Sequence, residues 1–283
     1  MARLVALLGH PVAHSISPAF QQAAFAASGL DARYEPWDVP PGELPGAVER
    51  LRGGDLLGAN VTVPHKVAVL GLVDRPDGAA ERVGAVNTVV NAGGLLEASN
   101  TDVAGLRAAW AEAGIAVAGE RAVLLGAGGA ARAAVAALSG LGARSVTVAN
   151  RTPGRAAALR ALAGEGLALS TCPLDAASGE LRSALSEASL VIHCTPLGMR
   201  HGPDETRSPL PRSAFRPGQV AFDSVYTPEW TPFLQEASRG GARAVGGLAM
   251  LVHQGAASFR LWTGVEPPLG VMFDAARAAL AGR

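Results

Sequence analysis

A short apolar run that ends in a cluster of glycines constrains the fold more than any other feature of this chain. Residues Ala122–Leu125 form a strand-like run, Gly126, Gly128 and Gly129 follow, and an alanine-rich helical stretch begins there. A strand, a glycine turn and a helix in this order form a βα unit of a parallel sheet. Short β-like runs alternate with longer helical runs along the chain, which is typical of α/β proteins. We therefore predict an α/β fold.

Hydrophobic periodicity and helix-start residues give the individual elements. The expected strands are Leu4–Leu8, Tyr34–Val39, Leu57–Val61, Val86–Asn91, Ala122–Leu125, Ser145–Ala149, Leu190–His193 and Val220–Asp223. The expected helices are Pro18–Ala27, Asp102–Ala113, Gly129–Ser139, Gly154–Leu162, Thr231–Arg239, Gly247–Trp262 and Pro268–Ala281. Because strands and helices alternate, the strands are expected to pair in parallel.

At 283 residues the chain exceeds the usual size of one domain, so we expect two. We predict a Rossmann-like, doubly wound parallel-sheet domain over 102–246, with Asp102–Ala113 as the connecting helix. The two last helices follow the end of the second sheet and are expected to return to the first domain. That N-terminal α/β domain would then comprise 1–101 plus 247–283, with a cleft between the two domains.

Composition excludes several classes of partner. The 24 basic and 24 acidic residues balance to a formal net charge of +0, which predicts no nucleic acid and no anionic membrane as a partner. The first apolar run is too short for a signal peptide or a membrane span. Cys172 and Cys194 are too few for a disulfide framework or a zinc site. We expect both to be core thiols of a cytoplasmic protein.

The glycine turn also indicates a cofactor. It matches the pattern G-x-G-x-x-A, in which the turn lets a pyrophosphate approach the amides and the positive dipole of the helix N-terminus. A merely structural turn is the alternative. The strand before it and the helix after it supply the context that a dinucleotide site requires. The predicted contact residues are Gly126, Ala127, Gly128, Gly129 and Ala130.

The segment after the next predicted strand favours NADP(H) over NAD. An NAD-binding protein usually carries an acid there for the ribose hydroxyl, whereas this chain has Asn150, Arg151, Thr152 and Arg155. An acid would repel a 2′-phosphate, and two guanidinium groups with a hydroxyl can bind one. The alternative is a solvated loop that holds two of many arginines.

Lys66 is the only lysine among the 24 basic residues, so the other 23 are arginines. Its survival could be chance in a chain that uses arginine as its general cation. It could also mark a position that needs an amine able to lose its proton, which a guanidinium cannot do. Lys66 follows a predicted strand that ends near Pro64, and α/β enzymes place ligands at the carboxyl ends of strands.

Polar turns accompany several other predicted strands. Ser17 and Pro18 predict a helix N-cap followed by proline at the first helical position, which leaves Ser15 without a structural role. His14 is expected to be a packing and hydrogen-bonding element. Asp102 stands at a helix start, where an acid can act simply through the helix dipole.

Taken together, these segments resemble the shikimate dehydrogenase family over almost the whole chain. The motifs that carry the resemblance are Gly9-x-Pro11-x-x-His14-Ser15-x-Ser17-Pro18, Asn60-Val-Thr62-Val-Pro64-x-Lys66, Gly84-Ala-Val-Asn87-Thr88, Asn100-Thr101-Asp102, Gly126-Ala-Gly128-Gly129-Ala130, Asn150-Arg151-Thr152, Thr195-Pro-x-Gly198-Met199, Asp223-x-x-Tyr226 and Gly247-x-x-Met250-x-x-x-Gln254. Their order and compatible spacing make the resemblance specific.

The resemblance implies an NADP(H)-dependent oxidoreductase that reversibly reduces 3-dehydroshikimate to shikimate, in aromatic amino acid and chorismate biosynthesis. By similarity, Ser15 and Ser17 hold the ring carboxylate, and Lys66 and Asp102 lie at the reacting oxygen. The same similarity places Thr62, Asn87, Tyr226 and Gln254 around the ring and Thr195, Met199 and Gly247 beside the nicotinamide.

The chain departs from the family pattern at two places. Gln21 stands where family members often have histidine, on the helix after the serines. His193 and Cys194 precede Thr195 where Asn-Ala or Asn-Thr is common, which puts cofactor affinity in question.

An ammonium at Lys66 would stabilise the developing alkoxide and donate a proton to it, with Asp102 favouring the charged amine. The formal proton donor within this coupled pair stays open. One alternative is a quinate or quinate/shikimate dehydrogenase that uses NAD(P), and another is a non-catalytic NADP-binding sensor. As partners we expect only the small substrate and, in assembly, a monomer or a homodimer.

Overall fold

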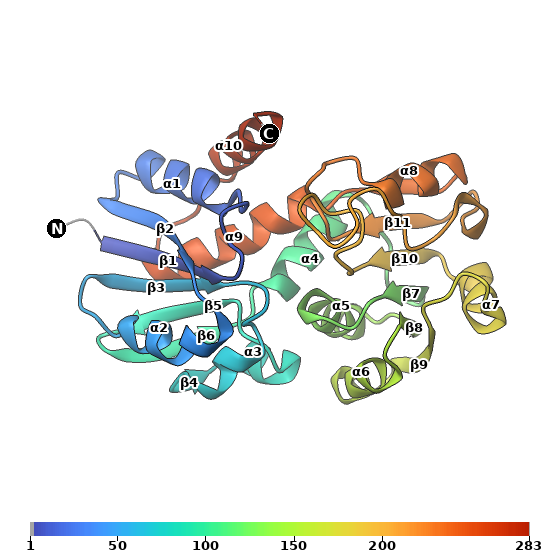
Figure 1. The fold of residues 1–283 in the computed structure, drawn as a ribbon, viewed down its shortest axis with the longest axis horizontal. Coiled ribbons are helices and arrows are strands. Elements are labelled where there is room, and N and C mark those ends of the chain that lie inside the picture. Colours follow the sequence, from blue (N-terminus) through green and yellow to red (C-terminus); the bar gives the residue numbers. More distant parts are fainter. Residues whose placement is uncertain (1–2, 283) are drawn as a thin grey trace. The chain divides into compact units, whose positions relative to one another are not determined.

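We describe the protein from a computed structural model, which describes residues 3–282. The chain divides into two compact units (Figure 1). Unit 1 comprises Met1–Gly105 and Leu251–Arg283, and unit 2 comprises Leu106–Met250. The unit boundaries therefore fall inside two helices, α4 (Asp102–Glu112) and α9 (Leu248–Thr263).

Unit 1 contains a six-stranded mixed sheet in the order β2-β1-β3-β5-β6-β4. Its strands are β1 (Arg3–Gly9), β2 (Ala32–Asp38), β3 (Leu56–Val61), β4 (Arg75–Pro76), β5 (Thr88–Ala92) and β6 (Leu95–Ser99). Its helices, apart from the two that cross the boundary, are α1 (Ser17–Ala27), α2 (Leu44–Arg50), α3 (Gly78–Val83) and α10 (Leu269–Ala281). The core of the unit is formed by apolar residues of β1, β3, β5 and α2, such as Leu8, Val61 and Val89.

The expectation of parallel pairing throughout is wrong for this sheet. β1 runs parallel to β2 and β3, but β5 runs antiparallel to both β3 and β6. β5 and β6 form a hairpin whose two-residue loop is Gly93-Gly94, both with positive φ, which is the backbone that a tight hairpin turn demands. The sequence prediction missed this glycine pair and with it β6.

Unit 2 contains a six-stranded sheet in the order β12-β11-β10-β7-β8-β9, and every pair in it is parallel. Its strands are β7 (Arg121–Leu125), β8 (Ser145–Asn150), β9 (Ala168–Pro173), β10 (Leu190–His193), β11 (Val220–Asp223) and β12 (Arg243–Val245). Its helices are α5 (Gly129–Gly140), α6 (Pro153–Ala157), α7 (Gly179–Glu187) and α8 (Pro232–Arg239). The strand order reverses between β7 and β10, as in a doubly wound Rossmann-like sheet, so that prediction is confirmed.

The elements that the sequence prediction missed have weak local patterns. β9 and β12 are edge strands that bury few residues, and α2 contains Pro45 and Gly46, which are unfavourable in a helix. α3, α7 and the two-residue β4 were missed as well. The expected helix Gly154–Leu162 is a short α-helix, α6, followed by a 3-10 turn over Ala158–Leu162.

Two further expectations concern the membrane and the cysteines. Over residues 3–282, every helix falls short of the length and apolar character that crossing a bilayer requires. Cys172 is a buried core thiol as expected, and burial, aided by the nearby Glu180, raises the pKa of its thiol. Cys194 is only half-buried, so the expectation of two core thiols is wrong for it. The reason is its place just beyond the end of β10.

Candidate active site

Four polar segments of unit 1 converge at one edge of its sheet. Because β1, β3 and β6 run in the same direction, the segments that follow them lie at the same edge. β5 runs the opposite way, so its first residues lie there too. Ser15, Lys66, Asn87 and Asp102 therefore belong to four separate parts of the sequence that lie at this edge.

The one lysine lies beside a buried carboxylate at this edge. Lys66 Nζ donates a hydrogen bond of 2.6 Å to Oδ2 of Asp102, the first residue of α4. The Asp102 side chain is 4% exposed, whereas the Lys66 side chain is 19% exposed. The carboxylate fixes the position of the ammonium, and the ammonium keeps a face that a ligand can reach.

Asn87 holds the other side of this carboxylate. Its Nδ2 donates to Asp102 Oδ1 at 2.8 Å, so each carboxylate oxygen has its own donor. The Asp102 backbone N–H donates to Asn100 Oδ1 at 3.1 Å. Hydrogen bonds to an ionised group are stronger than neutral ones, and together these bonds fix the orientation of the carboxylate toward Lys66.

Behind the pair lies a buried polar network that the sequence prediction did not find. Asn87 Oδ1 accepts from the Thr101 N–H at 2.7 Å, and Asn87 Nδ2 donates to Gln254 Oε1 at 3.1 Å. Ser258 Oγ lies 3.1 Å from Thr101 Oγ1 and 2.7 Å from Thr88 Oγ1. Ser258 follows Gln254 by one helical turn on α9, and this spacing is the only signal that could have found it.

The serines that precede α1 differ from the prediction. The N-cap position of α1 is occupied by Ile16, and no side chain caps this helix, so the N-cap prediction for Ser17 is wrong. Ser15 Oγ instead accepts from the Ser17 N–H at 3.2 Å, a local serine turn that replaces the cap. Over the described part of the chain, the Ser17 and Thr62 hydroxyl groups bond no protein group, which leaves both available to a ligand.

The glycine turn of unit 2 fits a bound pyrophosphate. Gly126 has a φ of +108°, and a Cβ there would lie 2.9 Å from the Cys194 carbonyl oxygen. Gly128 is the N-cap of α5, no side chain caps the helix, and a Cβ on Gly128 would meet nothing within 4 Å. No side chain therefore caps the amides at the start of this 12-residue helix, and the space beside Gly128 is open, an arrangement that can bind a phosphate group.

The predicted phosphate-binding segment directly follows β8, the neighbour of β7. Arg151, Thr152 and Arg155 are exposed, and Asn150 Nδ2 donates to the Thr152 carbonyl at 2.9 Å. Neither guanidinium group forms an ion pair with any residue from 3 to 282. Two unpaired cations beside the glycine turn suit a 2′-phosphate.

The predicted nicotinamide-side residues come from the segments of unit 2 that follow β10 and β12. Thr195 follows β10, and its Oγ1 lies 2.5 Å from Nε2 of His193, a ring that is 0% exposed. Gly247 packs so closely on β11 that a Cβ would lie 2.7 Å from the Asp223 carbonyl oxygen. Met199 is 36% exposed. Tyr226 is half-buried and lies in unit 2, just after β11.

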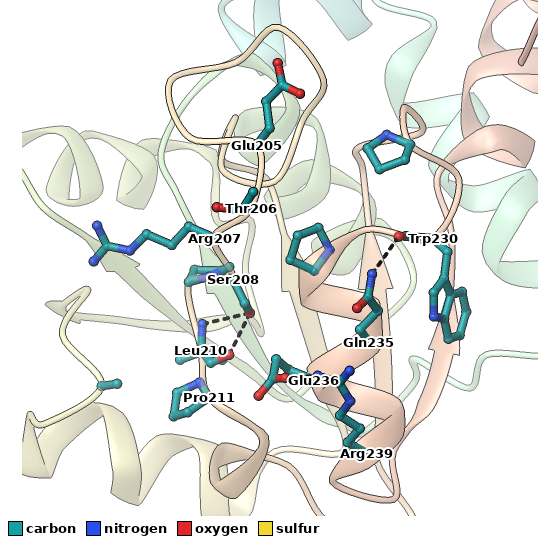
Figure 2. Close-up of a pocket in the computed structure, with 14 residues that line it drawn as sticks. Glu205, Thr206, Arg207, Ser208, Leu210, Pro211, Trp230, Gln235, Glu236 and Arg239 are labelled. Atoms are coloured by element: carbon teal, nitrogen blue, oxygen red, sulfur yellow. Dashed lines mark hydrogen bonds and ion pairs between the residues drawn. The ribbon is translucent and has the colours of Figure 1, made fainter. Parts of the chain in front are cut away.

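Unit 2 also contains a separate hollow of about 790 Å³ (Figure 2). It is lined by the segment from Glu205 to Pro211 and by residues of and around α8, including Trp230. Its polar groups bond one another: Gln235 Nε2 donates to the Trp230 carbonyl at 3.3 Å, and Glu236 pairs with Arg239 at 2.7 Å. None of the predicted site residues lines it, so we do not assign the chemistry to this hollow.

Comparison with known proteins covers nearly the whole chain. Three family models match: the shikimate dehydrogenase substrate binding domain over residues 7–89, shikimate / quinate 5-dehydrogenase over 109–197, and the shikimate 5'-dehydrogenase C-terminal domain over 247–277. The chain is 50% identical over 280 residues to the shikimate dehydrogenase (NADP(+)) of Moorella thermoacetica. That match covers 98% of this chain and 93% of the relative.

Solved structures of shikimate and quinate dehydrogenases are also similar to this chain over nearly its whole length. Shikimate 5-dehydrogenase from Thermus thermophilus, in complex with NADP(H) and shikimate, is 43% identical with a TM-score of 0.87 and covers 98% of this chain and 100% of its own. Quinate dehydrogenase from Corynebacterium glutamicum, in complex with NAD, is 30% identical with a TM-score of 0.84 and covers 98% and 99%. On this similarity and on the motifs gathered at the two sheet edges, the chain belongs to the shikimate dehydrogenase family.

Proposed function

We propose that this protein catalyses the NADP(H)-dependent, reversible reduction of 3-dehydroshikimate to shikimate. The observation that carries the proposal is the 2.6 Å bond between the only lysine and the buried Asp102. Its relatives of 40–50% identity are NADP-dependent shikimate dehydrogenases, and the Thermus thermophilus structure holds NADP(H) and shikimate. The protein is accordingly an oxidoreductase that acts on a CH–OH group.

In the direction of reduction, NADPH supplies the hydride when it is bound. The carbonyl oxygen of the substrate then gains negative charge and needs a proton. The Lys66 ammonium stabilises that charge and donates the proton, and Asp102 holds the ammonium in position. In the reverse direction the amine of Lys66 accepts the hydroxyl proton. Because the two groups are coupled, the proton transfer belongs to the pair.

The remaining groups at the edge of the unit 1 sheet suit a polyhydroxylated ring acid. We propose that the hydroxyl groups of Ser15 and Ser17 bind the ring carboxylate. Asn87 and Gln254, which already bond each other, would present further polar atoms to the ring hydroxyls, together with Thr62. Tyr226, which belongs to unit 2, is a further residue that we propose for substrate binding. The hydroxyl of Ser17, free of protein partners within residues 3–282, supports this assignment.

The glycine turn and the segment after β8 would hold the cofactor. We propose that Gly126–Ala130 bind the pyrophosphate and that Asn150, Arg151, Thr152 and Arg155 bind the adenosine 2′-phosphate. Thr195, Met199 and Gly247 would line the nicotinamide. On this assignment residues 1–101 plus 247–283 form the substrate domain and residues 102–246 form the NADP domain. We propose that the enzyme works in the cytoplasm as a monomer or homodimer.

A quinate dehydrogenase shares the fold, so the fold alone does not choose the substrate. The unpaired Arg151 and Arg155 favour NADP, and the paired serine hydroxyls favour a shikimate-type carboxylate. An absorbance assay with shikimate or quinate and with NADP or NAD tests both choices. We expect the highest kcat/KM for shikimate with NADP. Preference for quinate with NAD would contradict the proposal, and NADP binding without any turnover would indicate a non-catalytic NADP sensor.

A further inference from the structure

A buried chain of hydrogen bonds links the core of unit 2 to Thr195. Thr231 Oγ1 donates to Asp223 Oδ2 at 2.6 Å, Asp223 Oδ1 lies 2.9 Å from His193 Nδ1, and His193 Nε2 lies 2.5 Å from Thr195 Oγ1. The first three residues are 0% exposed, whereas Thr195 is half-buried. Thr195 is therefore the one member of this chain of bonds that solvent reaches.

The surroundings of Asp223 set the direction of these bonds. Leu234 N–H donates to Thr231 Oγ1 at the start of α8, which turns the Thr231 hydroxyl hydrogen toward Asp223. The Val225 N–H donates to Asp223 Oδ1 at 2.9 Å. A carboxylate accepts only, so His193 Nδ1 carries the hydrogen that it shares with Asp223.

In the neutral ring, His193 Nε2 is then an acceptor, and the Thr195 hydroxyl donates its hydrogen to it. The Leu197 N–H donates to Thr195 Oγ1 at 3.3 Å and occupies one of its lone pairs. Thr195 thus retains a single free lone pair. A ligand at Thr195 meets a hydrogen-bond acceptor and not a donor.

Thr195 lies where one half of a dinucleotide must lie. The strand order reverses between β7 and β10, and α/β proteins bind dinucleotides at such a point. The predicted 2′-phosphate segment follows β8 on one side of β7. Thr195 follows β10 on the other side, and a Cβ on Gly126 would lie 3.0 Å from its methyl group. A cofactor whose pyrophosphate lies on the glycine turn and whose adenosine lies over β8 extends its nicotinamide over the end of β10.

We propose that His193 is a positioning residue that fixes the Thr195 hydroxyl as an acceptor for the primary amide N–H of the nicotinamide. This inference rests on the proposed NADP site of unit 2. It concerns a residue at which this chain departs from the asparagine common in its family. An asparagine amide ends near the place of His193 Nδ1, so it keeps the bond to Asp223 and leaves a gap toward Thr195.

Binding of cofactor analogues without substrate tests the inference. In the 3-acetylpyridine analogue of NADP a methyl group replaces the amide NH2 and the carbonyl remains, whereas the thionicotinamide analogue keeps the NH2. We expect the wild-type protein to bind the acetylpyridine analogue about 2- to 10-fold more weakly than NADP in titration calorimetry, the range for one net hydrogen bond. The thionicotinamide analogue should follow NADP in every variant.

Four variants separate the role of the Thr195 hydroxyl from the role of His193. Thr195→Val removes the hydroxyl and should bring the ratio of the Kd for the acetylpyridine analogue to the Kd for NADP to about 1. Thr195→Ser should retain the wild-type ratio. His193→Asn should also bring the ratio to about 1 although Thr195 is intact. His193→Phe provides a second test, because the phenyl ring keeps the packing on Phe233, whose centroid is 4.9 Å from that of His193. Circular dichroism identifies any variant that does not fold, and the other His193 variant then decides.

An unchanged ratio in Thr195→Val would show that the hydroxyl does not bind the amide. A ratio lost in Thr195→Val but kept in both folded His193 variants would show that His193 does not set the polarity of Thr195. Either result overturns the inference. Failure of the wild-type protein to prefer NADP over NAD would count against the proposed cofactor site itself, and it is a separate measurement.

Discussion

Asp102 begins α4 in unit 1 and Asp223 ends β11 in unit 2, and each is a buried carboxylate that bonds one basic side chain. Their partners differ in exposure. The Lys66 side chain beside Asp102 is 19% exposed, whereas the His193 side chain beside Asp223 is 0% exposed. A basic group that solvent reaches can exchange a proton with a ligand. A sealed one can act only through the next group in its chain, which here is Thr195.

The carboxylates also differ in how they are held. Asp102 accepts hydrogen bonds from Lys66 and Asn87, both of which belong to the proposed substrate site. Besides His193, Asp223 accepts hydrogen bonds from the Thr231 hydroxyl at the start of α8 and from the Val225 N–H just after β11. On the proposals above, a buried carboxylate supports proton transfer in unit 1 and the positioning of a cofactor contact in unit 2. Substitutions at the two sites whose effects on activity, cofactor binding and stability are measured separately test this comparison.

The largest expected effect is that of Lys66→Arg. The variant keeps a cation but loses a group that can give up a proton, so kcat should fall by about 10² to 10⁴. The Kd for NADP should stay within about 2-fold of wild type, because the residues that we propose for cofactor binding lie in unit 2. Steady-state kinetics and calorimetry measure the two quantities.

Because a guanidinium is broader than an ammonium, a second measurement accompanies that variant. An amine-selective reagent has two targets in this chain, Lys66 and the N-terminal amine. Inactivation should follow labelling of Lys66 in mass spectra, and shikimate should protect it. An enzyme fully labelled at Lys66 that still turns over would contradict the role given to this lysine.

The same substitution at each carboxylate sharpens the comparison. Asp102→Asn should lower kcat about 10²-fold or more with a small change in stability, since solvent can reach the unpaired Lys66. Asp223→Asn places an amide N–H2 against the Thr231 hydroxyl and should lower the free energy of unfolding by about 1–3 kcal/mol. Urea unfolding and kcat on both variants check this. Equal stability losses would remove the distinction between the two pairs.

Arg151→Ala tests whether Arg151 of unit 2 binds the 2′-phosphate of NADP. Charge-assisted hydrogen bonds contribute about 1.5–3 kcal/mol, so the Kd for NADP should rise about 10- to 150-fold. The Kd for NAD, which lacks the 2′-phosphate, should change little. The control is Arg33→Ala, since Arg33 is an exposed arginine of β2 in unit 1. A similar loss for both cofactors would show that Arg151 supports the fold instead.

The smallest expected effects concern two hydroxyl residues at helix starts. Thr231 caps α8 and also donates to the buried Asp223, so Thr231→Ala should cost at least about 1 kcal/mol of stability. Ser17 does not cap α1, so Ser17→Ala should leave stability nearly unchanged while it raises the KM for shikimate. Thermal unfolding compares the two variants directly. A stability loss in Ser17→Ala as large as that in Thr231→Ala would restore a capping role for Ser17.

The sequence by itself determined the features that depend on local spacing. A glycine turn between Leu125 and α5, with arginines after the next strand, indicates a dinucleotide site because each part lies within a few residues of a strand end. The position of Lys66 after β3 follows from the same rule. The doubly wound order of unit 2 follows from strands that alternate with helices.

The family resemblance implied that Lys66 and Asp102 meet, but local spacing did not, and only the tertiary structure decided the other contacts. Lys66 and Asp102 are 36 residues apart, His193 and Asp223 are 30 apart, and Asn87 and Gln254 are 167 apart. Sheet order and strand direction bring them together, and neither leaves a trace in local periodicity. The antiparallel β5 in particular turns Asn87 toward the edge where Lys66 lies. The absence of a cap at Ser17 has the same cause at shorter range, because the hydrogen bond from its backbone to Ser15 depends on how the loop folds.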